Sequence, residues 1–154
     1  MGMIRRIILL LIPMLVMLAQ DATPWKKSET LESAALAAML KAPGEKPAIL
    51  YVGFPMLYRG ARIPGAVLAG PAAKPEGIDL IKQAVAKLPK NRNIVLYCGC
   101  CPFERCPNVR PAFQVLRDLG FTNVKLVIMP TNLHTDWVAK GYPVEKAAGA
   151  ATAN

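Results

Sequence analysis

Short apolar runs alternate with longer amphipathic segments along most of the chain. Four runs rich in aliphatic residues predict buried strands. They are residues 48–52, 66–68, 94–97 and 124–128. Four segments with helix-forming composition or helical spacing of apolar positions predict helices. They are residues 30–40, 78–88, 109–119 and 131–140. This alternation is typical of an α/β fold with a central, mainly parallel sheet, because parallel strands need helical crossovers.

The boundaries of these elements position one loop in particular. The run at residues 94–97 is the most β-prone, so we place it at the centre of the sheet. Asn108 is the expected N-cap of the helix that follows, and Gly120 its C-terminal stop. Residues 53–64 are rich in Gly and Pro and predict an irregular connection. Residues 98–107 therefore connect the central strand to a helix.

The start of the chain has a different character from the rest. Arg5 and Arg6 precede an uncharged, strongly apolar stretch at residues 7–19. This stretch is shorter than the roughly 20 residues of a membrane-spanning helix and ends where the chain turns polar. It predicts a signal peptide at residues 1–20, with an uncleaved anchor as the alternative. We therefore expect an exported protein, periplasmic or extracellular, with no stable membrane span after cleavage.

Length and composition indicate one domain behind this leader. The chain has 154 residues and is 53% hydrophobic, which suits a single core and excludes a mostly disordered protein. The mean hydropathy of +0.30 owes much to the leader. Residues 147–154 are all small and mostly alanine, have no large apolar side chain to bury, and predict a disordered tail.

The formal net charge of +9 suggests anionic partners. The basic residues are scattered along the chain, however, with no basic cluster interleaved with aromatic residues. We therefore expect no nucleic-acid binding. His134, the single histidine, is expected at the surface or at a helix start, although its position would also allow it to face the loop at 98–107.

Four cysteines within nine residues mark the most unusual chemistry. They are Cys98, Cys100, Cys101 and Cys106. Open α/β sheets place ligands at the carboxyl ends of their strands, where loop amides and the next helix N-terminus stabilise an anion. A thiol there is favoured as the thiolate. The positive charges of Arg105 and Arg110 act in the same direction, so the sequence predicts a nucleophilic sulfur.

The order of motifs resembles a rhodanese domain over residues 28–146. The similarity rests on the Tyr97-Cys98 step from strand to loop, on Leu-Gly-Phe-Thr-Asn-Val at 119–124, and on the segment 137–144. Upstream, Ala-Arg-Ile-Pro-Gly-Ala at 61–66 looks like the family's Gly-His-Ile-Pro-Gly-Ala element. The resemblance implies a rhodanese-like three-layer fold.

The resemblance also implies a sulfurtransferase in which Cys98 carries sulfane sulfur as a persulfide. The sulfur would come from a small anionic donor such as thiosulfate and pass to a thiol or cyanide acceptor, with no organic cofactor. From their place in or next to the loop, we expect Gly99, Cys100, Cys101, Arg105 and Arg110 to bind the anion. The protein partner stays unassigned.

The sequence departs from the family pattern in ways that leave the site chemistry open. Tyr-Val-Gly-Phe at 51–54 replaces an Asp-x-Arg-like element, and Arg62 replaces a histidine. The long loop adds Cys100, Cys101 and Cys106. One of them could resolve a persulfide as a disulfide. They could instead hold a soft metal such as Cu(I) or Zn(II) in a non-catalytic binding module, or form disulfides that only pin the loop.

Overall fold

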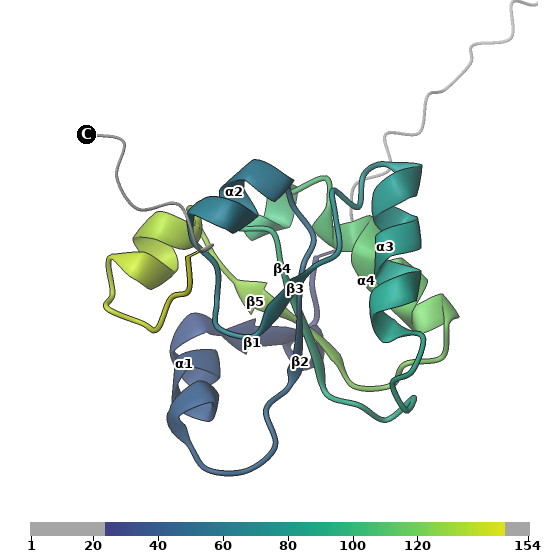
Figure 1. The fold of residues 1–154 in the computed structure, drawn as a ribbon, viewed down its shortest axis with the longest axis horizontal. Coiled ribbons are helices and arrows are strands. Elements are labelled where there is room, and N and C mark those ends of the chain that lie inside the picture. Colours follow the sequence, from purple (N-terminus) through teal and green to yellow (C-terminus); the bar gives the residue numbers. More distant parts are fainter. Residues whose placement is uncertain (1–23, 147–154) are drawn as a thin grey trace, which may run out of the picture.

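The computed structural model describes residues 24–146, which form a five-stranded, all-parallel sheet (Figure 1). The strands lie in the order β1-β5-β4-β2-β3. Their bounds are β1 Thr30–Glu32, β2 Ala48–Tyr51, β3 Ala66–Leu68, β4 Ile94–Tyr97 and β5 Val124–Ile128. The α/β class and the central position of β4 are thus confirmed. The predicted leader (1–20) and tail (147–154) lie outside the described residues.

Helices cover both faces of the sheet and complete three layers. The helices α3 (Pro75–Val85) and α4 (Val109–Asp118) pack together on one face, while α1 (Ser33–Lys41) and a π-helix (His134–Val138) lie on the other (Figure 1). Successive strand residues alternate between the two cores, as the pleat requires. Leu96 joins the core beneath α3 and α4, and its neighbour Val95 joins the opposite core with Trp137.

Residues 30–32 are an edge strand, although the sequence predicted a helix there. The register pairs Leu31 with Val127, so the backbone of β1 hydrogen-bonds along β5. The helix begins only at Ser33, whose buried hydroxyl donates to the carbonyl of Ile128 at 2.8 Å. Pairing with a distant strand outweighs the local helix propensity, which the sequence alone does not reveal.

Part of the predicted loop at 53–64 is also helical. The short helix α2 spans Pro55–Gly60, and Pro55 occupies its first turn, where a missing N–H costs nothing. The proline that suggested a loop in fact begins this helix. Among the other helices, α3 begins earlier than expected, again at a proline, and α4 matches its prediction closely. Two single 3₁₀ turns lie at Lys27–Glu29 and Phe103–Arg105.

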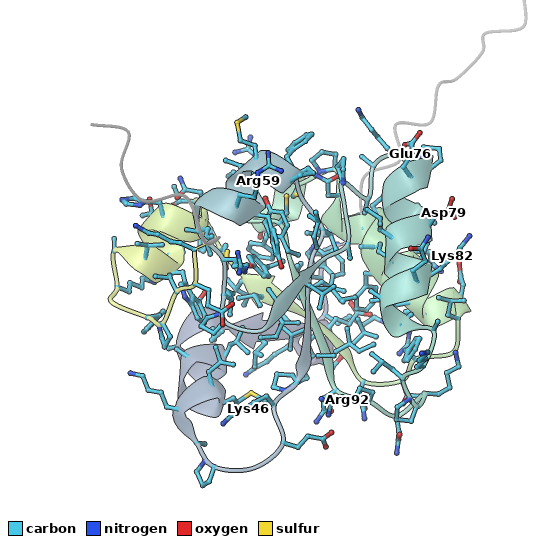
Figure 2. All side chains as sticks on the ribbon, in the orientation of Figure 1. Lys46, Arg59, Glu76, Asp79, Lys82 and Arg92 are labelled. Atoms are coloured by element: carbon cyan, nitrogen blue, oxygen red, sulfur yellow. The ribbon has the colours of Figure 1, made fainter. Side chains whose placement is uncertain are left out.

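Charged side chains lie on the outside of the layers (Figure 2). Arg92, just before β4, forms an ion pair with Glu45 and donates to the carbonyl of Lys46 at 2.6 Å. These contacts join the segments that precede β2 and β4, at the edge of the sheet opposite the cysteines. Asp79 and Lys82 form an exposed pair on α3 at 3.6 Å. Within residues 24–146, no helix is long and apolar enough to cross a membrane.

Candidate active site

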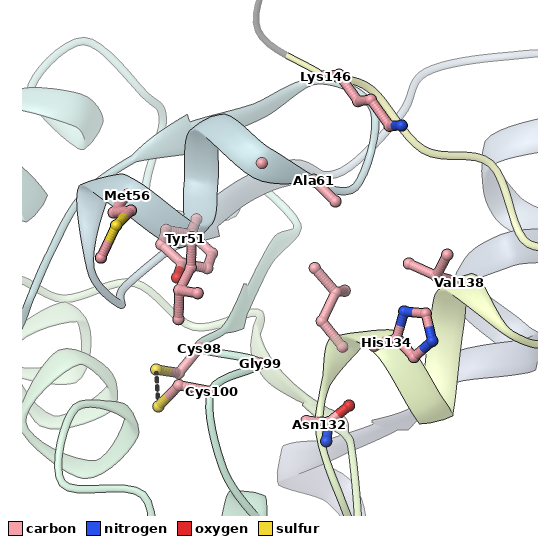
Figure 3. Close-up of a pocket in the computed structure, with 13 residues that line it drawn as sticks. Tyr51, Met56, Ala61, Cys98, Gly99, Cys100, Asn132, His134, Val138 and Lys146 are labelled. Carbon is pink, nitrogen blue, oxygen red and sulfur yellow. Dashed lines mark hydrogen bonds between the residues drawn. The ribbon is translucent and has the colours of Figure 1, made fainter. Parts of the chain in front are cut away.

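The cysteine loop, residues 98–107, begins at the carboxyl end of β4 (Figure 3). All four residues of β4 are buried, which fixes the point at which the chain leaves the sheet. Two backbone bonds tie the loop to the segment after β5. Phe103 N–H donates to the carbonyl of Met129 at 3.0 Å, and Leu133 N–H donates to the carbonyl of Gly99 at 2.9 Å. The loop is therefore anchored at both its start and its middle.

The four thiols of this loop lie close together. Cys98 is only 3% exposed, and its Sγ lies 3.1 Å from Sγ of Cys100, which in turn lies 3.2 Å from Sγ of Cys101. The sulfurs of Cys98, Cys100 and Cys106 all lie within 4.8 Å of one another. The structure thus brings together the cysteines that the sequence singled out.

Gly99 is what allows Cys98 and Cys100 to face each other. Its φ of +73° is strained for any residue with a Cβ. A Cβ at this position would also lie 2.8 Å from Cβ of Leu133. Both the backbone conformation and the close approach therefore require glycine.

Asn108, at the start of α4, fixes the position of the Cys98 sulfur. Its Oδ1 accepts a hydrogen bond from Ala73 N–H at 2.9 Å, and its Nδ2 donates to Sγ of Cys98 at 3.5 Å. Asn108 is the N-cap residue of α4, as predicted, but its side chain makes no capping hydrogen bond. The buried amide instead links the segment before α3 to the sulfur.

The protonation of the loop is uneven, because Cys98 and Cys106 share a hydrogen bond. That bond from Cys98 lowers the pKa of Cys106 to about 5, against the effect of burial, and the backbone amides of Asn108 and Val109 lower it further. The same bond raises the pKa of Cys98, as does its burial, while the amide of Cys100 acts weakly in the opposite direction. Burial and neighbouring thiols raise the pKa of Cys101 to about 12. Within this pair the hydrogen bond favours the thiolate of Cys106, whereas the sequence favoured a thiolate at Cys98.

A pocket of about 580 Å³ opens beside Cys98 and Cys100 (Figure 3). We call it the Cys98 pocket. Helix α2 forms one wall, with Met56, and the segment around the π-helix forms another, with His134. Lys146 lies at the side opposite the sulfurs. Within the described part of the chain the lining contains Lys146 and no carboxylate, so its net charge is positive and favours an anion.

Tyr51, at the end of β2, points into the Cys98 pocket beside the sulfurs (Figure 3). Its hydroxyl is buried and has no hydrogen-bond partner among residues 24–146, although the backbone amide of Phe54 has a small lowering effect on its pKa. Burial, and then the nearby Cys98 sulfur, raises the pKa of Tyr51, so the O–H proton stays available to donate. A Cβ on Gly53 would lie 2.7 Å from the Tyr51 hydroxyl oxygen and 2.8 Å from the Cys98 sulfur. Glycine thus leaves room for both groups.

The remaining predicted site residues lie elsewhere. Arg105 is exposed at the end of its 3₁₀ turn and does not line the Cys98 pocket. The Arg110 guanidinium lies 4.5 Å above the ring of Trp25, in a separate surface hollow. Cys101 and Cys106 lie behind Cys98, in tightly packed surroundings with Phe103. Only Gly99 and Cys100 of the predicted anion-binding set share the pocket with Cys98.

Tyr51 was the main omission from the sequence-based site. Its position at the end of a buried strand suggested a core residue. The one available signal was its place at the carboxyl end of a strand that we expected to lie in the same sheet as residues 94–97.

Comparisons with known proteins bear on the fold. Neither protein-family models nor curated proteins match the sequence. Among solved structures, the rhodanese-like domain of an Anabaena sp protein is 24% identical, with a TM-score of 0.59 over 82% of this chain and 85% of that one. A Bacillus halodurans protein is 23% identical (TM-score 0.62; 81% and 82% covered). A rhodanese-related protein from Thermoplasma volcanium is 19% identical (TM-score 0.52; 76% and 97% covered).

Proposed function

We propose that this chain, which has the rhodanese-like fold, is a sulfurtransferase that carries sulfane sulfur as a persulfide on Cys98. The observation that supports this most is the position of Cys98. Its thiol follows the central strand and lines a pocket in which the described residues supply no carboxylate and leave a tyrosine hydroxyl without a partner. Such a pocket suits a small sulfur-containing anion.

The first half-reaction loads the sulfur. Cys98 passes its proton to the Cys106 thiolate and attacks the outer sulfur of a thiosulfate-like donor. The sulfur–sulfur bond of the donor breaks, and its electron pair leaves with sulfite. Cys98 then holds a persulfide anion, and the Tyr51 hydroxyl donates a hydrogen bond to it.

The second half-reaction unloads it. An acceptor thiolate attacks the outer sulfur of the persulfide and takes it, and the electron pair of the broken sulfur–sulfur bond returns to Cys98. Cys98 regains its proton from Cys106. The sequence of steps needs no organic cofactor, because sulfur is transferred between nucleophiles without a net redox change.

Intact-mass measurement tests the assignment of Cys98. Reduced protein is incubated with thiosulfate, desalted and weighed, alongside Cys98→Ser and Cys101→Ser. We expect a gain of one sulfur atom in the wild type and in Cys101→Ser, and none in Cys98→Ser. An adduct of equal yield in Cys98→Ser would contradict the proposal.

We further propose that the domain acts after export, in the periplasm or outside the cell. The support is the basic and apolar pattern of residues 1–20. N-terminal sequencing of the protein made with its leader checks this. A start within a few residues of Gln20 is expected, and an intact Met1 would contradict cleavage.

A further inference from the structure

Three thiols of the cysteine loop converge on one point. The sulfurs of Cys98, Cys100 and Cys106 lie within 4.8 Å of one another, and each residue offers one ligand atom. Cys101 falls outside this group, although its sulfur lies 3.2 Å from that of Cys100. His134 lines the same pocket but is not part of the group either.

The donor set identifies the kind of ion that would fit. Soft thiolates select Cu(I), zinc or iron–sulfur clusters, whereas magnesium and calcium need oxygen ligands. Structural zinc sites are closed by four ligands, and within residues 24–146 this group supplies three. Three thiolates match a trigonal site for a soft monovalent ion. We propose that Cys98, Cys100 and Cys106 bind a single Cu(I) ion.

The distances allow such a site with little rearrangement. A metal–sulfur bond of about 2.3 Å places three trigonal sulfurs about 4 Å apart. The three sulfurs already lie within 4.8 Å of one another, and the sulfurs of Cys98 and Cys100 must move apart from 3.1 Å. Cys100 is half-buried and lines the pocket, so its side chain has room to move.

The surroundings of the sulfurs are those of a metal site with supporting hydrogen bonds. Asn108 Nδ2 donates to Cys98, and Asn108 is itself fixed by Ala73 N–H at 2.9 Å. The backbone amides of Asn108 and Val109 face Cys106. Donors of this kind orient thiolate ligands and offset the negative charge that three thiolates and one Cu(I) leave. The pocket opens to Cys98 and Cys100, which gives the ion a path.

Copper binding goes beyond the proposed sulfur transfer and does not depend on it. The ion is bound without change of oxidation state, and the thiols that are still protonated release their protons to solvent. The two activities share Cys98, so a bound Cu(I) would prevent persulfide formation. The domain would then hold either copper or sulfur at this position.

A competition titration tests the site. Freshly reduced protein, free of any sulfur donor, is titrated without oxygen with Cu(I) against the chromophoric chelator bathocuproine disulfonate. We expect one Cu(I) per chain, and a copper X-ray absorption spectrum with sulfur ligands only. Absence of binding in competition with the chelator would overturn the proposal.

Single substitutions show which sulfurs are ligands. We expect Cys98→Ser, Cys100→Ser and Cys106→Ser each to weaken binding by at least about 100-fold, the upper limit for losing only a supporting contact. Cys101→Ser is the matched control and should bind as the wild type does. A loss in Cys101→Ser as large as the others would indicate a four-cysteine site and overturn the trigonal assignment.

One further measurement and the sulfur-loading assay keep the outcomes separate. Circular dichroism identifies a variant that fails to fold. If the buried substitution Cys106→Ser prevents folding, Cys100→Ser still tests the site, because Cys100 is only half-buried. Copper binding without sulfur loading would refute only the proposed function. Sulfur loading without copper binding would refute only the copper site.

Discussion

At the scale of single residues, Tyr51 has the clearest functional signature, because its buried hydroxyl has no hydrogen-bond partner among residues 24–146 and lies beside Cys98. We predict that Tyr51→Phe slows sulfur loading by about 10- to 100-fold, the value of one hydrogen bond to a charged group. Stability should not fall, since no bond is lost within the protein. Tyr58→Phe is the control, because the Tyr58 hydroxyl donates to Ala66 O at 2.7 Å outside the pocket.

The two tyrosine variants are compared by their rates of sulfur loading and by their stability in urea unfolding. Tyr58→Phe should lose about 1 kcal/mol of stability and keep its rate. A Tyr51→Phe protein that loads sulfur at the wild-type rate would show that the hydroxyl has no role in the reaction.

The protonation of Cys106 leads to a prediction about the pH dependence of thiolate absorbance. Its pKa is lowered to about 5, so the thiolate is present above that pH and lost as the pH falls through it. The ultraviolet absorbance of the thiolate should therefore show a titration near pH 5 in the wild type and in Cys101→Ser, and none there in Cys106→Ser. If instead the low-pH titration survives in Cys106→Ser and disappears in Cys98→Ser, the charge rests on Cys98.

The sequence predicted the position of the Cys98 thiol better than it predicted the side chains around it. Cys98, Gly99 and Cys100 could be placed from the strand that precedes them. The two arginines could not, because closeness in sequence does not fix side-chain direction. Arg110 lies over Trp25, a residue far away in the chain, and that contact was invisible before the fold was known.

At the scale of elements, the turn at Gly99 shapes the site. Gly99→Ala should cost about 2–4 kcal/mol, because it combines a left-handed backbone with an overlap against Leu133. Gly120→Ala is a matched control, since φ there is +85° but no atom lies within 4 Å of a new Cβ. It should cost only about 1–2 kcal/mol in urea unfolding. Equal losses in the two variants would mean that Leu133 yields easily.

Helices and strands were predicted correctly where a clear hydrophobic pattern extended over enough residues. The strand β4 and the helix α4 follow the pattern closely. The strand β1 did not, because three residues carry too little pattern and depend on pairing with β5. The helix α2 was hidden by Pro55, which favours a loop in isolation and a helix start in context.

At the scale of the whole molecule, the parallel sheet places all strand ends at one edge. Tyr51 from β2 and Cys98 from β4 meet there because β2 and β4 are neighbours, with Tyr51 opposite Tyr97. Asn108, at the start of α4, also contacts Cys98 there and so connects the layer of α3 and α4 to this edge. The sequence predicted the layers and this edge, whereas the meeting of Tyr51, Cys98 and Asn108 requires the folded chain.

The site of sulfur attachment tests the central claim most directly. Reduced protein is loaded with thiosulfate labelled at its outer sulfur, alkylated at once, digested, and mapped by mass spectrometry. We predict the labelled sulfur on Cys98, with Cys100, Cys101 and Cys106 recovered as alkylated thiols. Label found mainly on another cysteine, or on none, would contradict the account of Cys98 as the sulfur carrier.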